Sequence, residues 1–239
     1  MNFRFLFYLI TGLFFFGCNN YKNIKENKFH YDLFNENSSK KIQTVYSVPA
    51  GYSPDKSYPL IVVLHGLGEN AEAFAEIWKE ACNSKGYVLL SVQGEKQISD
   101  QAHYAWGRNA ENNILLSIDE IKKIINIDNS GIYLGGFSAG ASLANYLSLK
   151  YPFQIRGTIS ISGSFPFEYF EKSLVNKNNK YYLACGEQET EFSNKISEIG
   201  KLLKTRSINC KVKLFENSGH TIPKPWKETI SEMLSFMKE

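Results

Sequence analysis

The sequence predicts an α/β fold with a mostly parallel central sheet and helices on both of its faces. From residue 42 onward, short apolar runs alternate with amphipathic stretches. Several of the runs are continuously apolar, as in strands that are buried on both faces. This alternation of strands and helices is typical of a parallel sheet. A chain of 239 residues, 43% of them apolar, suffices for one such domain.

The expected elements follow one another along the chain with short connections. Apolar positions at helical spacing mark four helices, and a fifth is expected at 141–147. About seventeen residues separate 163 from 181, which leaves no room for an inserted cap domain. The seven expected strands cover 43–48, 60–64, 87–92, 132–137, 158–162, 181–185 and 212–215. The helices are marked by Phe74, Ile77, Trp78 and Ala81; by Ile114, Ile118, Ile121 and Ile125; by Phe192, Ile196, Ile199 and Leu203; and by Ile230, Met233, Leu234 and Met237.

The N-terminal stretch has the pattern of a secretory signal peptide. Arg4 precedes the apolar run 5–16, which is far shorter than the roughly 18–20 apolar residues that cross a bilayer. We predict that residues 1–17 are a signal peptide and that residues 42–239 form the folded domain. The intervening residues 18–41 are rich in Asn, Lys, Ser and Glu, which predicts a tether with a short edge element near 29–34.

Cys18 follows Gly17 and precedes two asparagines. This segment resembles the lipobox of bacterial lipoproteins, in which such a cysteine is lipidated and becomes the new N-terminus. The resemblance implies an exported protein, periplasmic or at the outer membrane, that is anchored to a membrane through Cys18. Phe15 and Phe16 depart from the usual pattern, so an ordinary signal peptide with a coincidental cysteine is the alternative. Asn19, in place of aspartate, favours the outer membrane.

The remaining cysteines and the charge exclude several classes of protein. Cys82, Cys185 and Cys210 are odd in number and cannot all pair within the chain. Cys185 and Cys210 fall on neighbouring predicted strands, where a disulfide is one interpretation and buried free thiols are the preferred one. Their spacing does not fit a zinc site, so neither a metal nor another cofactor is expected. A net charge of +3 is too small to indicate a nucleic-acid partner.

The strongest chemical signal is Gly136-Phe137-Ser138-Ala139-Gly140. It lies between a predicted strand and a predicted helix, which is the context of a nucleophile elbow. A serine there adopts a strained backbone geometry, and the residues two positions away must lack a side chain. Ser138 is therefore the predicted nucleophile.

Two further segments predict the rest of the catalytic machinery. His65-Gly66-Leu67-Gly68 directly follows the strand 60–64. We expect the backbone N–H groups of Leu67 and Ala139 to form an oxyanion hole, with His65 in a structural role. His220 is the only one of four histidines that lies after Ser138 in the chain, and the order nucleophile, acid, base makes it the predicted base.

These segments together resemble the α/β-hydrolase superfamily over residues 42–239. Within it, they resemble the phospholipase/carboxylesterase branch and, nearly as well, the exported polyhydroxybutyrate-depolymerase-like and feruloyl esterases. The resemblance implies a serine hydrolase that cleaves small-molecule carboxylic esters through an acyl-enzyme. The motifs do not decide the branch. They are 48–52, 59–68, 136–140 with Tyr151-Pro152, and 218–220.

The acid of the triad departs from the family pattern. Relatives usually place an aspartate in a Gly-x-x-Asp arrangement, but no Asp occurs between Ser138 and His220. The corresponding segment contains Glu187, Glu189 and Glu191. Glu189 has the family spacing from Gly186, and a glutamate can orient the imidazole as an aspartate does. We therefore predict Glu189 as the acid.

Aromatic residues in two loops are candidates for the substrate pocket. Tyr104 and Trp106 lie in the expected loop 93–109, and Phe165 and Phe167 follow the strand 158–162. An equally weighted alternative is that these aromatics only pack the loops. Two other functions stay open on the sequence alone: a non-catalytic binding lipoprotein, and a peptidase or acyl transferase with the same triad.

Overall fold

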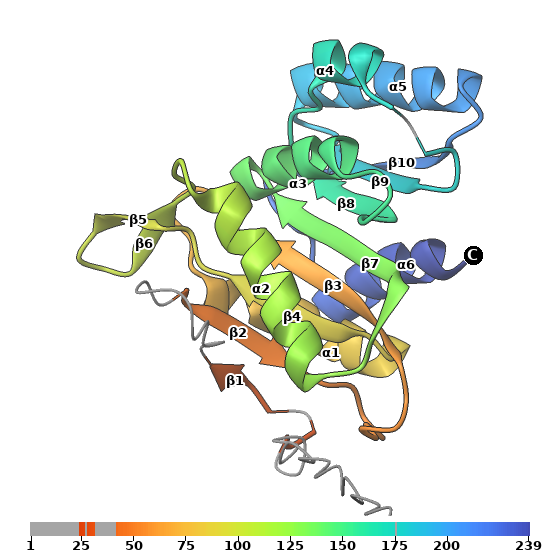
Figure 1. The fold of residues 1–239 in the computed structure, drawn as a ribbon. Coiled ribbons are helices and arrows are strands. Elements are labelled where there is room, and N and C mark those ends of the chain that lie inside the picture. Colours follow the sequence, from red (N-terminus) through yellow and green to blue (C-terminus); the bar gives the residue numbers. More distant parts are fainter. Residues whose placement is uncertain (1–23, 27, 32–41, 175) are drawn as a thin grey trace, which may run out of the picture.

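The computed structural model describes residues 24–26, 28–31, 42–174 and 176–239. These residues form an eight-stranded sheet in the order β1-β2-β4-β3-β7-β8-β9-β10 (Figure 1). The pairings among β4, β3, β7, β8, β9 and β10 are parallel, whereas β1 and β2 add an antiparallel edge. The expected mostly parallel sheet is therefore confirmed. The sheet strands are β1 (His30–Tyr31), β2 (Thr44–Ser47), β3 (Tyr58–Leu64), β4 (Val88–Val92), β7 (Ile127–Phe137), β8 (Gly157–Ile161), β9 (Lys180–Gly186) and β10 (Asn209–Phe215).

Helices cover both faces of the sheet (Figure 1). One core cluster joins α1 and α6 to one face, and two others join α2, α3, α4 and α5 to the opposite face. Each face thus has its own apolar layer, as the continuously apolar strands predict. The helices are α1 (Ala71–Lys85), α2 (Ala110–Ile124), α3 (Ala139–Lys150), α4 (Phe167–Lys172), α5 (Thr190–Thr205) and α6 (Trp226–Lys238).

Two short elements occur where the sequence predicts loops. A hairpin of β5 (Lys96–Ser99) and β6 (His103–Ala105) lies within 93–109, and α4 lies within 163–180. The hairpin is mostly exposed and polar, so it lacks the apolar alternation that marks a strand. Within the described residues, α4 is the only helix between β8 and β9, and no cap domain is inserted there.

The predicted signal peptide, Cys18 and most of the predicted tether lie outside the described residues. Within the tether, His30 and Tyr31 pair with Tyr46 and Val45, which places a two-residue strand in the expected edge segment. In the described part of the chain, no helix is both long enough and apolar enough to span a bilayer.

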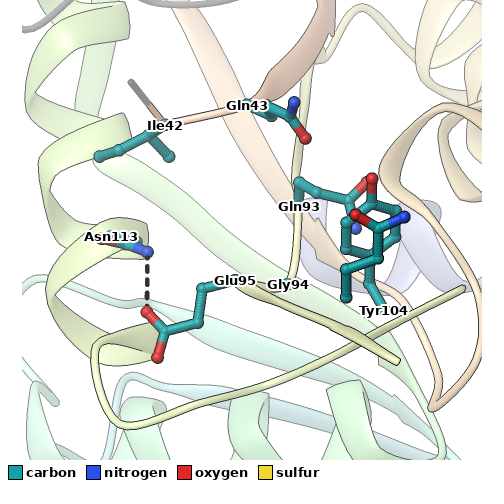
Figure 2. Close-up of a pocket in the computed structure, with 8 residues that line it drawn as sticks. Ile42, Gln43, Gln93, Gly94, Glu95, Tyr104 and Asn113 are labelled. Atoms are coloured by element: carbon teal, nitrogen blue, oxygen red, sulfur yellow. Dashed lines mark hydrogen bonds between the residues drawn. The ribbon is translucent and has the colours of Figure 1, made fainter. Parts of the chain in front are cut away.

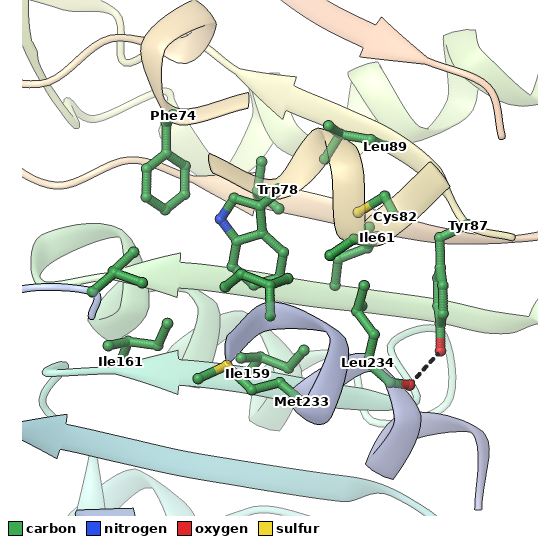
Figure 3. Packing of buried hydrophobic residues seen from close by; sticks show 14 of the residues in the cluster. Ile61, Phe74, Trp78, Cys82, Tyr87, Leu89, Ile159, Ile161, Met233 and Leu234 are labelled. Carbon is green, nitrogen blue, oxygen red and sulfur yellow. Dashed lines mark hydrogen bonds between the residues drawn. The ribbon is translucent and has the colours of Figure 1, made fainter. Parts of the chain in front are cut away.

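Trp78 of α1 anchors the core beneath the strand that leads to Ser138. It is fully buried and packs among residues of α1, α6 and the sheet (Figure 3). A Cβ added to Gly135 would lie 2.6 Å from Cη2 of Trp78, so only glycine admits the indole at this position of β7. This contact fixes α1 against the end of β7, just before the turn that carries Ser138.

The cysteines of the described chain are buried free thiols, as preferred from the sequence. In the β9–β10 ladder, Cys210 lies opposite Tyr181 and Cys185 lies opposite Leu214, so the two thiols are four positions apart. The alternative of a disulfide between them is therefore wrong. Burial raises the pKa of Cys185 to about 11 and the pKa of Cys210 to about 12.

Candidate active site

Ser138 occupies a sharp turn between β7 and α3. Its backbone has φ 55° and ψ −118°, a strained conformation for a residue with a side chain. The flanking glycines make this turn possible. A Cβ on Gly136 would lie 2.6 Å from the Ala141 nitrogen, and one on Gly140 would lie 2.0 Å from the Leu64 oxygen. Both glycines of G-x-S-x-G are therefore required sterically.

The structure brings Ser138, His220 and Glu189 together. The Nε2 atom of His220 is 2.9 Å from Oγ of Ser138, and its Nδ1 atom is 2.5 Å from Oε2 of Glu189. The carboxylate can only accept, so Nδ1 carries the proton and Nε2 is left to accept the serine proton. The three side chains follow β7, β9 and β10, whose carboxyl ends lie at one edge of the sheet. The arrangement is that of a nucleophile, a base and an orienting acid.

Glu189 precedes the first residue of α5, and its side chain is only 8% exposed. Its Oε1 atom accepts hydrogen bonds from Oγ of Ser162, at 2.5 Å, and from the Gly186 N–H, at 3.0 Å. Burial alone raises the pKa of this carboxyl, but the bonds from Ser162, His220 and Gly186 outweigh it and lower the pKa overall. The carboxylate therefore stays ionised and can stabilise a charged imidazole.

Gly186 explains why the acid stands three residues after a glycine. A Cβ on Gly186 would lie 2.2 Å from the carbonyl oxygens of Ser218 and Gly219. The missing side chain thus allows the loop that carries His220 to approach the end of β9. The other two glutamates lie elsewhere: Glu187 accepts the Asn217 N–H at 3.3 Å, and Glu191 is exposed and pairs with Lys195.

Ser162 is a site residue that the sequence analysis missed. It directly follows β8 and has φ 53°, and its N–H donates to the Ala184 oxygen at 2.7 Å. These features direct its hydroxyl to Glu189. A serine at the carboxyl end of a strand next to the elbow strand was the available signal.

The two expected oxyanion donors lie on segments that touch. Ala139 is the first residue of α3, so its N–H has no acceptor within the helix. The Leu67 N–H donates no hydrogen bond within the described residues. The two segments are in contact, because a Cβ on Gly140 would lie 2.5 Å from the His65 oxygen.

His65 is buried and structural, as predicted. Its Nδ1 donates to the Gly66 oxygen at 2.7 Å, while its Nε2 accepts the Gly94 N–H at 2.9 Å. Burial lowers the pKa of this imidazole, which keeps it neutral. The Trp106 indole stacks on the ring at 4.8 Å and donates from Nε1 to the His65 oxygen at 2.9 Å.

Of the four pocket candidates, Tyr104 and Trp106 support the loop 65–69. The backbone carbonyl of Tyr104 accepts the Gly68 N–H, and the backbone N–H of Tyr104 donates to the Glu69 carbonyl oxygen. The Tyr104 side chain lines a polar pocket of about 280 Å³ with Gln93 and Glu95 (Figure 2). The Trp106 side chain packs on this loop, the alternative weighed from the sequence, whereas the Tyr104 side chain lines a pocket that contains no residue of the predicted triad.

Phe165 and Phe167 line a different pocket, of about 330 Å³, between the segment after β8 and helix α5. Phe192 belongs to the same lining, and its ring is 6.4 Å from the His220 ring. The pocket therefore borders the triad. In the sequence, Phe192 belongs to the apolar stripe of a predicted helix, a pattern that gives no sign of its position beside His220 at the first turn of α5.

Nothing in the described chain resembles a metal centre. No group of three or more His, Cys, Asp or Glu side chains that could hold an ion occurs among those residues.

Comparison with known proteins identifies a family. The pattern of the phospholipase/carboxylesterase family matches residues 52–238. A poly(3-hydroxyalkanoate) depolymerase C of Paucimonas lemoignei is 27% identical over 131 residues, which are 51% of this chain and 31% of that relative. The match thus spans less than a third of the relative's own length.

Solved structures share the fold. A ferulic acid esterase superposes with a TM-score of 0.66 and 14% identity, over 88% of this chain and 97% of the other. FphF, a fluorophosphonate-binding serine hydrolase of Staphylococcus aureus, superposes with a TM-score of 0.68 and 12% identity, over 88% of this chain and 99% of the other. The BES protein of Bacillus cereus superposes with a TM-score of 0.67 and 17% identity, over 90% of this chain and 97% of the other.

Proposed function

The chain belongs to the phospholipase/carboxylesterase family of α/β-hydrolases, and we propose that it is a serine carboxylesterase acting through an acyl-enzyme on Ser138. The observation that carries this proposal is the continuous set of contacts from Ser138 through His220 to Glu189. Beside the intact triad, the N–H groups of Leu67 and Ala139 have no hydrogen-bond acceptor among the described residues, which argues against a non-catalytic binding module.

Each step follows from the geometry of these groups. Oγ of Ser138 attacks the ester carbonyl carbon while Nε2 of His220 takes the hydroxyl proton. The carbonyl oxygen gains the electron pair and accepts hydrogen bonds from the Leu67 and Ala139 N–H groups. The intermediate collapses, and the alcohol leaves with the proton from His220. Water then attacks the acyl-enzyme by the same route, which releases the acid and restores Ser138.

The pocket beside His220 limits the size of the substrate. Its volume of about 330 Å³ is at the small end for ligand sites, and half of its ten lining residues are aromatic or aliphatic. In the described residues no cap extends it into a longer tunnel. The proposed substrates are therefore esters with short acyl groups or small aromatic groups.

We expect the full-length protein to hydrolyse these small esters with the highest kcat/KM in a panel of varied acyl and alcohol size. The physical reason is that a chain longer than the pocket extends into solvent, where each added carbon buries less apolar surface and gains less binding energy. Steady-state kinetics across the panel test both the activity and the size limit. A catalytic efficiency that rises steadily through long acyl chains contradicts the size limit, and no hydrolysis of any ester contradicts the function.

A matched pair of variants tests the pocket within the same panel. Phe167 lines the pocket, whereas Tyr169 lies on the same short helix, is similarly exposed and packs on Tyr146. Phe167→Ala should raise KM for aromatic esters roughly fivefold, equivalent to about 1 kcal/mol of lost apolar contact. Acetate esters, and all esters with Tyr169→Ala, should change little.

We also propose that residues 1–17 direct export and that a lipid on Cys18 anchors the protein to a membrane, the outer membrane being preferred. The support is the short apolar run that ends at Gly17-Cys18. We expect wild-type protein to partition with membranes and Cys18→Ser to be released or unprocessed. Cell fractionation and intact-mass measurement test this, and a mature protein without added lipid mass contradicts it.

A further inference from the structure

We infer that Glu69 is a positioning residue of the oxyanion hole, which it serves by fixing the peptide planes that aim the Leu67 N–H. The inference rests on the proposed esterase function and extends it to a residue that lies outside the triad. Glu69 is half-buried, and its Oε2 atom accepts the Gly66 N–H at 2.6 Å.

The peptide between His65 and Gly66 is held at both ends. Its N–H donates to the Glu69 carboxylate, and its carbonyl oxygen accepts the indole N–H of Trp106 at 2.9 Å. A planar peptide with both polar groups bonded cannot rotate without breaking one of them. The Gly66 N–H is thereby also withdrawn from the substrate.

The next peptide, between Gly66 and Leu67, is held at one end only. The Gly66 oxygen accepts from Nδ1 of His65 at 2.7 Å and from the Glu69 N–H at 3.2 Å. In a trans peptide the N–H points opposite to the carbonyl, so the Leu67 N–H is directed away from these two groups, and no other described residue accepts it. Gly68, with φ +83°, completes the tight turn that this arrangement requires.

The carboxylate also lies on the catalytic side of the loop. A Cβ on Gly66 would lie 3.0 Å from Oε2 of Glu69 and 3.1 Å from Cδ1 of Phe137, whose ring is 4.8 Å from the His220 ring. Phe137, the residue before the nucleophile, therefore packs between this loop and His220. A displacement of the Glu69 carboxylate would therefore change the orientation of the Leu67 N–H more directly than the positions of the triad side chains.

Burying the ionised carboxyl of Glu69 lowers the stability of the fold, and such an unfavourable buried charge is typical of functional groups. Burial raises the pKa of its carboxyl, although the Gly66 N–H and the electrostatic interaction with His220 act in the opposite direction. A raised pKa means that ionisation is less favourable in the folded chain than in the unfolded one. The penalty is fully present above the raised pKa, declines as the pH falls through it and is absent below the unfolded value.

Two substitutions separate the acceptor from the charge. Glu69→Ala removes the acceptor, and we expect kcat to fall at least about tenfold, with KM nearly unchanged. Glu69→Gln keeps an oxygen that can accept the Gly66 N–H, so kcat should stay within a few-fold of wild type, with a melting temperature that is equal or higher. Glu76→Ala, an exposed glutamate on α1, is the matched control and should change neither quantity.

An inhibitor reports on the oxyanion directly. Oγ of Ser138 attacks the carbonyl carbon of a trifluoromethyl ketone, and its proton passes to Nε2 of His220. The π pair of the carbonyl moves to the oxygen, which becomes a negative oxygen in the oxyanion hole. Glu69→Ala should weaken its binding to the full-length protein by the same factor as kcat/KM. Equal losses in Glu69→Ala and Glu69→Gln, or a Glu69→Ala protein with unchanged kcat and inhibitor affinity, would overturn the inference. A third contradicting result would be a fall in kcat of Glu69→Ala that is explained entirely by the fraction of protein unfolded at the assay temperature. An inactive wild type would instead overturn the proposed function, and this inference with it.

Discussion

We expect Ser138→Ala to abolish both ester hydrolysis and labelling by a fluorophosphonate probe, without a change in the circular dichroism spectrum. The substitution removes the atom that forms the acyl bond, and loss of the nucleophile lowers kcat by on the order of 10⁶ in a well-studied serine hydrolase. Alanine is small enough for the strained turn, and Gly136 and Gly140 remain to accommodate it. The fold should therefore survive.

The control for this experiment is a serine remote from the site. Ser235 donates its hydroxyl to the Ser231 oxygen within α6, so Ser235→Ala should be labelled like the wild type. Labelling that persists in Ser138→Ala would show that another side chain is the nucleophile.

Glu189→Gln should lower turnover by about four orders of magnitude. The expected size is that of an acid-to-amide change in a serine protease triad, on the order of 10⁴. An amide can donate as well as accept, so it no longer specifies a proton on Nδ1 of His220 or stabilises the imidazolium. Ser162 and the Gly186 N–H would still bond to the side-chain oxygen, which should keep the protein folded. Turnover and thermal unfolding of the purified variant measure both effects.

Two neighbouring glutamates provide the controls. Among the described residues, the Glu187 side chain accepts one long hydrogen bond, from the Asn217 N–H, and Glu191 pairs with Lys195 at the surface. We expect Glu187→Gln and Glu191→Gln to retain nearly full turnover, because surface ion pairs contribute little. If Glu187→Gln were the inactive variant, the assignment of the acid would be wrong.

The fold was predictable because its determinants are local. Buried parallel strands need continuously apolar runs, and the helices show apolar stripes at a period of 3.6. The positions of Ser138 and Glu189 were predictable for a related reason: glycines beside them mark places where other backbone approaches closely. The hairpin β5–β6 and the helix α4 carry no such pattern, since both are short and largely exposed.

The roles of Ser162 and Glu69 depend on distant parts of the chain. Ser162 matters because β8 lies beside β9, which brings its hydroxyl to a carboxylate 27 positions away. Glu69 matters because Trp106, 41 positions after His65, bonds the other end of the same peptide. Neither relation leaves a periodic or compositional trace. Ordinary polar residues acquire these functions only when the sheet is assembled.

The exposure of His220 bears on which acceptor receives the acyl group. Its side chain is 47% exposed, and the described residues place no cap above it. If the reaction passes through the proposed acyl-enzyme, bulk water would reach that intermediate without a gating movement. Shielding such an intermediate from the solvent is one way in which an active site suppresses its hydrolysis. Under the proposed mechanism we therefore expect water to compete well with other alcohols and amines for the acyl group, so that the free acid is the main product.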